Sequence, residues 1–250
     1  MDLIINADDL GASTGVNRAV FQLMAKKKIT SATILANGES VREAVENLCH
    51  FPECSFGIHL NLTQYRPLTS SEPIKSLLDD EGQFAGLDRI KSTSFSRGLV
   101  EAVFEEFCAQ IDTLKGWGVK ISHIDSHQHI HNRLVLFWIL KRIQRRYSLR
   151  KVRISRNLYS PSAMPSRRLL LKKKLFNLML RHYYRTTTTR GFGNLQTFVE
   201  LGRLNQLPLE TVEVMVHPNL TNDDGTISQL ESDWICAMPV PVCLISYHQL

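Results

Sequence analysis

Short apolar runs rich in β-branched residues alternate with longer amphipathic stretches along this chain, and this alternation constrains its fold more than any other feature. The runs that we expect to be strands cover residues 3–5, 31–36, 54–61, 120–125, 152–155, 212–216 and 242–246. The helical periodicity between them covers residues 15–28, 41–49, 99–114, 134–147, 169–184 and 227–237. Strands that are separated by helical crossovers form a parallel sheet. We therefore predict an α/β fold, a deformed parallel (β/α) barrel of the TIM-barrel type with about seven strands.

The chain is long enough for one such barrel. Its 250 residues are 43% hydrophobic, and no internal repeat or composition change marks a boundary. We expect a single domain over residues 1–250. The loop 63–96 and the basic helical segment 157–190 are expected to be insertions, because a loop of this length exceeds a plain connector and is expected to shape a site.

The cysteines and the N-terminal region indicate the compartment. Five cysteines form no C-x-x-C pair, and their odd number does not suggest a disulfide framework. The first residues lack the basic region and cleavage site of a signal peptide, and no apolar stretch reaches the length of a spanning helix. We expect a cytoplasmic protein, with peripheral attachment to a membrane left open.

The net charge of +6 conceals a strong asymmetry. Residues 133–190 contain 17 Lys or Arg and no Asp or Glu, whereas the remainder has 13 basic against 24 acidic residues. One interpretation is a solvated outer helix of the barrel whose apolar side is core. Another is a surface that binds an anionic membrane or, less in keeping with the rest of the chain, nucleic acid. The block would also suit an anionic or lipid-linked glycan, and its apolar helix would suit a homodimer.

Five polar residues follow predicted strands or stand near their ends: Asp8, Asp9, His59, His127 and His217. In a parallel α/β barrel the carboxyl ends of the strands share one face, where active sites are built. Residues far apart in the sequence are therefore expected to meet in one pocket.

The segment 123–131 has four histidines and one aspartate at odd positions. In an extended chain alternate residues face the same side, which would align His123, Asp125 and His127. Single histidines are usually satisfied within a core or exposed to water, but this spacing favours metal ligation or catalysis. The adjacent Asp8 and Asp9 could cap a helix, or one could bind a cation while the other acts as a base.

Four motifs, taken together and in this order, resemble the YdjC-like family of carbohydrate deacetylases, which includes chito-oligosaccharide deacetylases. They are NADDLG at 6–11, GIHLNL at 57–62, HIDSHQH at 123–129 and MVHP at 215–218. The resemblance implies a deformed β/α barrel with a divalent ion on Asp9, His59 and His127. It also implies Asp8 as general base and His217 as general acid or oxyanion partner.

Further residues are expected to support the metal site or to bind substrate: Asn6, Asn61, Asp125, His129 and Arg153. The implied reaction is the metal-dependent hydrolysis of an acetamide on an N-acetylated sugar or oligosaccharide. The ion is left open between Mg²⁺, which prefers oxygen ligands, and Zn²⁺, which suits imidazoles. An alternative is an amidohydrolase-type metal-dependent barrel, because His127 and His129 form an H-x-H pair.

Overall fold

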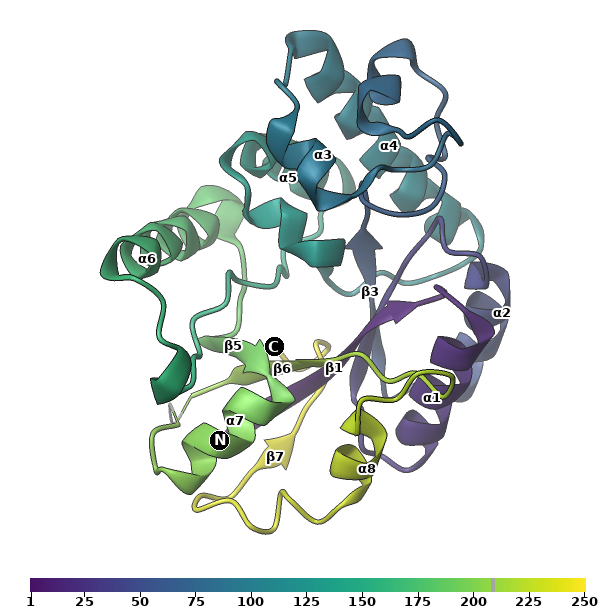
Figure 1. Cartoon of the computed structure of the whole chain (residues 1–250). Coiled ribbons are helices and arrows are strands. Elements are labelled where there is room, and N and C mark those ends of the chain that lie inside the picture. Colours follow the sequence, from purple (N-terminus) through teal and green to yellow (C-terminus); the bar gives the residue numbers. More distant parts are fainter. Residues whose placement is uncertain (208–209) are drawn as a thin grey trace.

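The chain forms a curled, parallel seven-stranded sheet surrounded by helices (Figure 1). The computed structural model describes residues 1–207 and 210–250. The strands are β1 (Asp2–Leu10), β2 (Ser31–Ile34), β3 (Ser55–Leu60), β4 (Ile124–Ser126), β5 (Gly191–Asn194), β6 (Val212–Val216) and β7 (Cys243–Leu244). Their order is β4-β3-β2-β1-β6-β5, with β7 paired to β1, and every ladder is parallel. The predicted fold class is confirmed.

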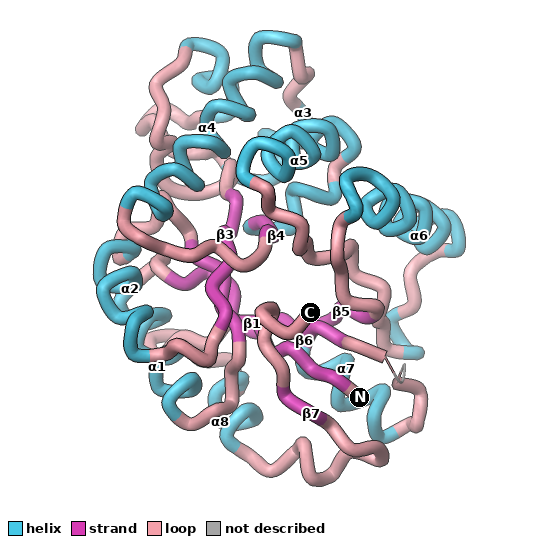
Figure 2. The backbone as a smooth tube through the Cα atoms, turned by 180° about the vertical axis from the view of Figure 1, so that it is seen from behind, coloured by secondary structure: helices cyan, strands magenta, loops and turns pink. Residues whose placement is uncertain are grey.

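Helices lie outside the sheet, as the view from behind shows (Figure 2). They are α1 (Thr14–Ala25), α2 (Val41–Asn47), α3 (Gly86–Ser92), α4 (Arg97–Gly116), α5 (Leu134–Tyr147), α6 (Arg167–His182), α7 (Leu195–Arg203) and α8 (Thr226–Glu231). Every residue of β2 and β3 is buried, because one face of the sheet lines the interior and the other lies under helices. Among the described residues, no helix is both long enough and apolar enough to cross a membrane.

Two short extended segments, at residues 151–152 and at Thr187, lie between the sheet edges β4 and β5. Val152 bridges to Ile124, and Lys151 bridges to Thr187, both in parallel. The predicted strand 152–155 is therefore wrong beyond its first residue, Val152. Its ladder cannot continue, because the side chain of Asn177 in α6 binds both the amide and the carbonyl of Ser155, at 2.8 and 3.0 Å.

Three other elements differ from the prediction. We did not predict β5, since a strand containing Gly191 and Gly193 has low β propensity. We also missed α7, although its amphipathic pattern and the N-cap Asn194 were usable signals. The predicted helix 227–237 is also wrong in its second half, because α8 ends at Glu231 and turns follow. The loop 63–96 contains α3, and the helical part of 157–190 is mainly α6, with short 3-10 turns on either side.

Candidate metal centre

A bulge at the end of β1 positions the two adjacent aspartates. Ala7 pairs with Ala32 and Leu10 with Ile34, so β1 has one residue more than β2 between these pairs. Asp9 has a φ of 65°, in the left-handed region, which aspartate adopts more readily than most residues. Successive side chains on a regular strand face opposite sides, but a bulge re-aims them. Both carboxylates consequently reach polar partners at this end of the sheet.

Asp9 meets two histidines from β3 and from the turn after β4. The Oδ1 atom of Asp9 lies 2.8 Å from Nδ1 of His127 and 3.2 Å from Nε2 of His59. One candidate ligand atom from each of these three residues lies within 4.8 Å of the others. Burial would raise the pKa of Asp9, but hydrogen bonds from the two imidazoles hold it well below its usual range. The sequence-predicted metal residues are thus brought together.

The other nitrogen of His59 contacts Asp125. His59 Nδ1 lies 2.6 Å from Asp125 Oδ1, and both side chains are buried. A carboxylate in this position fixes the tautomer of a histidine and directs its remaining nitrogen at a metal. Burial would lower the pKa of His59, but Asp125 raises it to about 10.

Asp8 forms a two-pronged ion pair with Arg153. Both guanidinium nitrogens Nη1 and Nη2 lie 2.7 Å from the carboxylate oxygens, and Asn6 donates a further hydrogen bond at 2.9 Å. Burial would raise the pKa of Asp8, but Arg153 holds it well below its usual range. His217 Nε2 lies 3.7 Å from Asp8 Oδ2, and its side chain is 54% exposed. Asp8 is therefore ionised and faces a histidine on the solvent side.

Arg153 links three acidic residues. Besides Asp8, it contacts Asp125 at 2.6 Å and Glu213 of β6 at 2.8 Å. Tyr247 donates a hydrogen bond to Glu213 at 2.6 Å, and burial raises the pKa of Glu213 to about 7. Our sequence analysis missed Glu213 and Tyr247, although an acid inside the apolar run 212–216 was a usable signal.

The cluster fits a divalent cation. Three carboxylates, from Asp8, Asp125 and Glu213, contact the single guanidinium of Arg153, and a fourth, from Asp9, contacts only imidazoles. Buried negative charge in excess of its counter-charges favours a bound cation. In addition, the Nε2 atom of His127 is buried and has no hydrogen-bond partner among the described residues.

The remaining predicted residues lie apart from the ligand atoms or serve the scaffold. His129, with a φ of 55°, packs its ring edge-on against Phe192 at 5.6 Å between centroids, and burial lowers its pKa to about 3. Neither metal-capable group found in the described residues includes it, which disfavours the amidohydrolase arrangement. The carboxamide of Asn61 bonds within its own loop, to Thr63 and Gln64, and donates to Asn37 in the loop after β2 at 3.1 Å.

His123 does not share the face expected for it. Its ring stacks on Tyr247 at 3.6 Å, and burial holds its pKa well below its usual range. Gly57 makes room for this ring, because a Cβ atom there would lie 2.5 Å from it. His123 is thus a packing residue beside the site.

Known proteins resemble this chain in sequence and in fold. The "Carbohydrate deacetylase" of Geobacillus stearothermophilus is 35% identical over 155 residues, 61% of this chain and 60% of that protein. The "Carbohydrate deacetylase" of Brevibacillus brevis is 36% identical over 148 residues, 59% of this chain and 57% of that protein. The matches thus span about 60% of the length of these relatives.

A solved structure from Enterococcus faecalis V583, whose name provisionally assigns it to cellobiose-phosphate cleavage, superposes with a TM-score of 0.77. It covers 99% of this chain and 98% of its own, at 24% identity, and therefore supports the fold alone. The family described as YdjC-like protein matches residues 2–238. This match covers most of the chain, which therefore belongs to the YdjC-like family.

Proposed function

We propose that the protein is a metal-dependent carbohydrate deacetylase that hydrolyses the acetamide of an N-acetylated sugar. The observation that carries this proposal is the convergence of Asp9, His59 and His127 beside the ionised Asp8 and the exposed His217. The names of the curated relatives supply the substrate class.

Asp9, His59 and His127 would hold the ion. One carboxylate and two imidazoles suit zinc better than magnesium, which prefers oxygen ligands. A divalent ion in this site would lower the pKa of water and polarise the acetyl carbonyl. Asp125 keeps the His59 ring oriented toward Asp9 through the 2.6 Å contact.

Asp8 and His217 would share the proton transfers. Water adds to the carbonyl carbon while Asp8 accepts its proton, and Arg153 fixes the orientation of that carboxylate through two contacts. The carbon–nitrogen bond then breaks, and His217 donates a proton to the departing amine. The products are acetate and the free amino sugar. The exposure of His217 leaves room for the sugar next to it.

Acetate release from N-acetylglucosamine oligomers by metal-stripped protein tests the proposal, with Zn²⁺ or Mg²⁺ restored. We expect release that needs the metal and is lost in Asp8→Asn and in His127→Ala. His129→Ala is the matched control, since it changes a neighbouring histidine that lies outside the ligand group. No acetate release with either ion, or loss of release only in His129→Ala, would refute the proposal.

A further inference from the structure

The outer side of α5 and α6 exposes an apolar patch. Of the eleven large hydrophobic side chains exposed in the described part of the chain, eight lie between residues 134 and 183. Six of them, each 45–67% exposed, form what we call the α5–α6 face: Leu134, Trp138, Leu171, Leu175, Leu178 and Tyr183. Large contiguous apolar patches on a protein surface mark sites of interaction.

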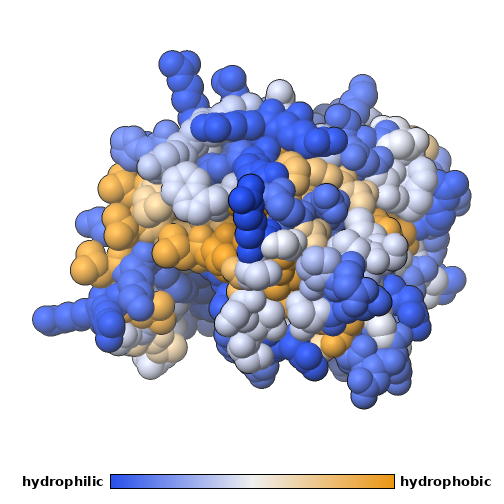
Figure 3. Space-filling view, turned by 90° about the horizontal axis from the view of Figure 1, so that it is seen from above, coloured by the Kyte–Doolittle hydropathy of each residue, from blue (hydrophilic) through white to orange (hydrophobic). Residues whose placement is uncertain are grey.

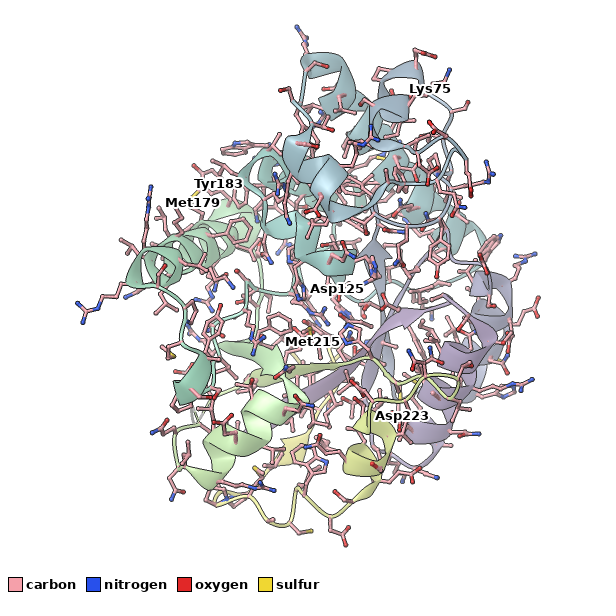
Figure 4. The ribbon with its side chains drawn as sticks, viewed as in Figure 1. Lys75, Asp125, Met179, Tyr183, Met215 and Asp223 are labelled. Carbon is pink, nitrogen blue, oxygen red and sulfur yellow. The ribbon has the colours of Figure 1, made fainter. Side chains whose placement is uncertain are left out.

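The α5–α6 face is continuous across both helices. The rings of Trp138 and Tyr183 pack edge-to-face at 5.3 Å between centroids. Leu134 of α5 and Leu175 and Met179 of α6 line one groove of about 440 Å³. Figure 4 shows Met179 and Tyr183 near each other at the end of α6. Apolar atoms gather on the left of Figure 3, the side on which α6 lies in Figure 1.

Buried hydrogen bonds beneath the α5–α6 face hold its two helices together. The buried ammonium of Lys141 in α5 donates to the carbonyls of Leu180 and Tyr183, at 2.9 and 3.0 Å, and to Thr186 at 2.8 Å. These bonds tie the end of α6 to α5. The patch is therefore a preformed surface of the fold.

Basic residues border the face. Leu171, Leu175 and Leu178 recur at intervals of four and three residues, which places them on one stripe of α6. The exposed Lys172 and Lys174 lie on opposite flanks of this stripe, given 100° per residue. The whole segment 133–190 has 17 basic and no acidic residues.

We propose that the α5–α6 face docks onto an anionic lipid bilayer. A helix that lies in a bilayer surface combines an apolar stripe with basic flanks, and amphipathic aromatic rings favour the same interface. Charge decides between this partner and a second copy of the chain. A two-fold dimer through the face would bring the basic flanks of one copy against the basic flanks of the other, where like charges repel. An anionic surface instead attracts both flanks.

Co-sedimentation of the full chain with vesicles tests the proposal. We expect binding to vesicles of mixed phosphatidylglycerol and phosphatidylcholine at low salt, and release at high salt. Pure phosphatidylcholine should bind far less. One basic residue near an anionic surface changes partitioning roughly fivefold, so Lys172→Gln/Lys174→Gln should weaken binding roughly 30-fold. The control Lys75→Gln/Lys120→Gln removes two exposed lysines elsewhere and should leave binding unchanged.

A second variant tests the apolar part. Leu171→Ser/Leu175→Ser should weaken vesicle binding with an unchanged melting temperature, because both side chains are exposed. Failure of the wild type to sediment with phosphatidylglycerol vesicles at low salt would overturn the proposal, as would equal losses in the two lysine variants. Sedimentation velocity without vesicles gives the remaining outcome. A dimer that the leucine variant converts to monomer would assign the face to self-association instead.

Discussion

Replacing Arg153 by methionine is the sharpest test of the buried charge cluster. The variant keeps the bulk of the side chain but leaves Asp8, Asp125 and Glu213 without the cation that contacts them at 2.6–2.8 Å. Removing one partner of a buried ion pair costs about 3–5 kcal/mol. Since three carboxylates lose their partner together, we expect the free energy of unfolding to fall by at least about 4 kcal/mol, a large part of the total stability of a typical domain.

Arg156→Met provides the matched control three residues along the chain. Arg156 donates to the carbonyl of Leu158 at 3.0 Å and to the hydroxyl of Thr197 at 2.9 Å, and it has no carboxylate partner among the described residues. Losing these two hydrogen bonds from the guanidinium to uncharged acceptors should cost less, about 1.5–3 kcal/mol, because no buried charge is left without a partner. Urea unfolding of the metal-free proteins gives the free energy of unfolding that each variant loses. The difference between the two losses measures the effect of the buried charges.

The dependence of folding stability on pH has a defined sign. In the wild type, Arg153 holds the pKa of Asp8 below its usual range, so this group stabilises the fold above about pH 4 and the contribution is lost as the pH falls. In Arg153→Met, burial without a counter-charge raises the carboxyl pKa values, so that protonation restores stability at low pH. The free energy of unfolding that Arg153→Met loses relative to the wild type should therefore be larger at about pH 7 than at about pH 4.5. Equal deficits in the two arginine variants, or a deficit independent of pH, would refute the reasoning.

Three further predictions concern neighbouring groups. Asp125→Asn should weaken zinc binding about 10–100-fold in isothermal titration, because it replaces the carboxylate that orients a ligand histidine by an uncharged amide; unchanged affinity would contradict this. Burial raises the pKa of Glu213 to about 7, so its contribution to stability falls as the pH rises from about 4.5 to 7, and Glu213→Gln should flatten that part of a plot of urea midpoint against pH. Gly57→Ala should destabilise the fold by about 1–3 kcal/mol in thermal unfolding, because its Cβ would lie 2.5 Å from the His123 ring. Gly116→Ala, with no described atom within 4 Å of the new Cβ, should be neutral or stabilising.

The elements with strong periodicity could be predicted from the sequence. The short runs of β2 and β3, rich in apolar and β-branched residues, and the amphipathic pattern of α5 needed no tertiary information. The convergence of Asp9, His59 and His127 followed from one rule, that parallel strands present their carboxyl ends on one side of the sheet.

The rest depended on contacts between distant segments. The strand predicted at 152–155 stops because Asn177, 22 residues later, takes the backbone groups of Ser155. Glu213 is buried because Arg153 and Tyr247 supply its partners, 60 and 34 residues away in the sequence. No local pattern contains such pairings.

The bulge in β1 means that the candidate site depends on chain length at one position as much as on side-chain identity. The extra residue lies between Ala7 and Leu10, where only Asp8 and Asp9 stand, so a chain with a regular ladder to β2 would have room for one of the two carboxylates. The bulge is what lets two adjacent aspartates act apart, since Asp8 reaches Arg153 while Asp9 reaches the histidines. A more regular sheet would therefore lack part of the candidate site.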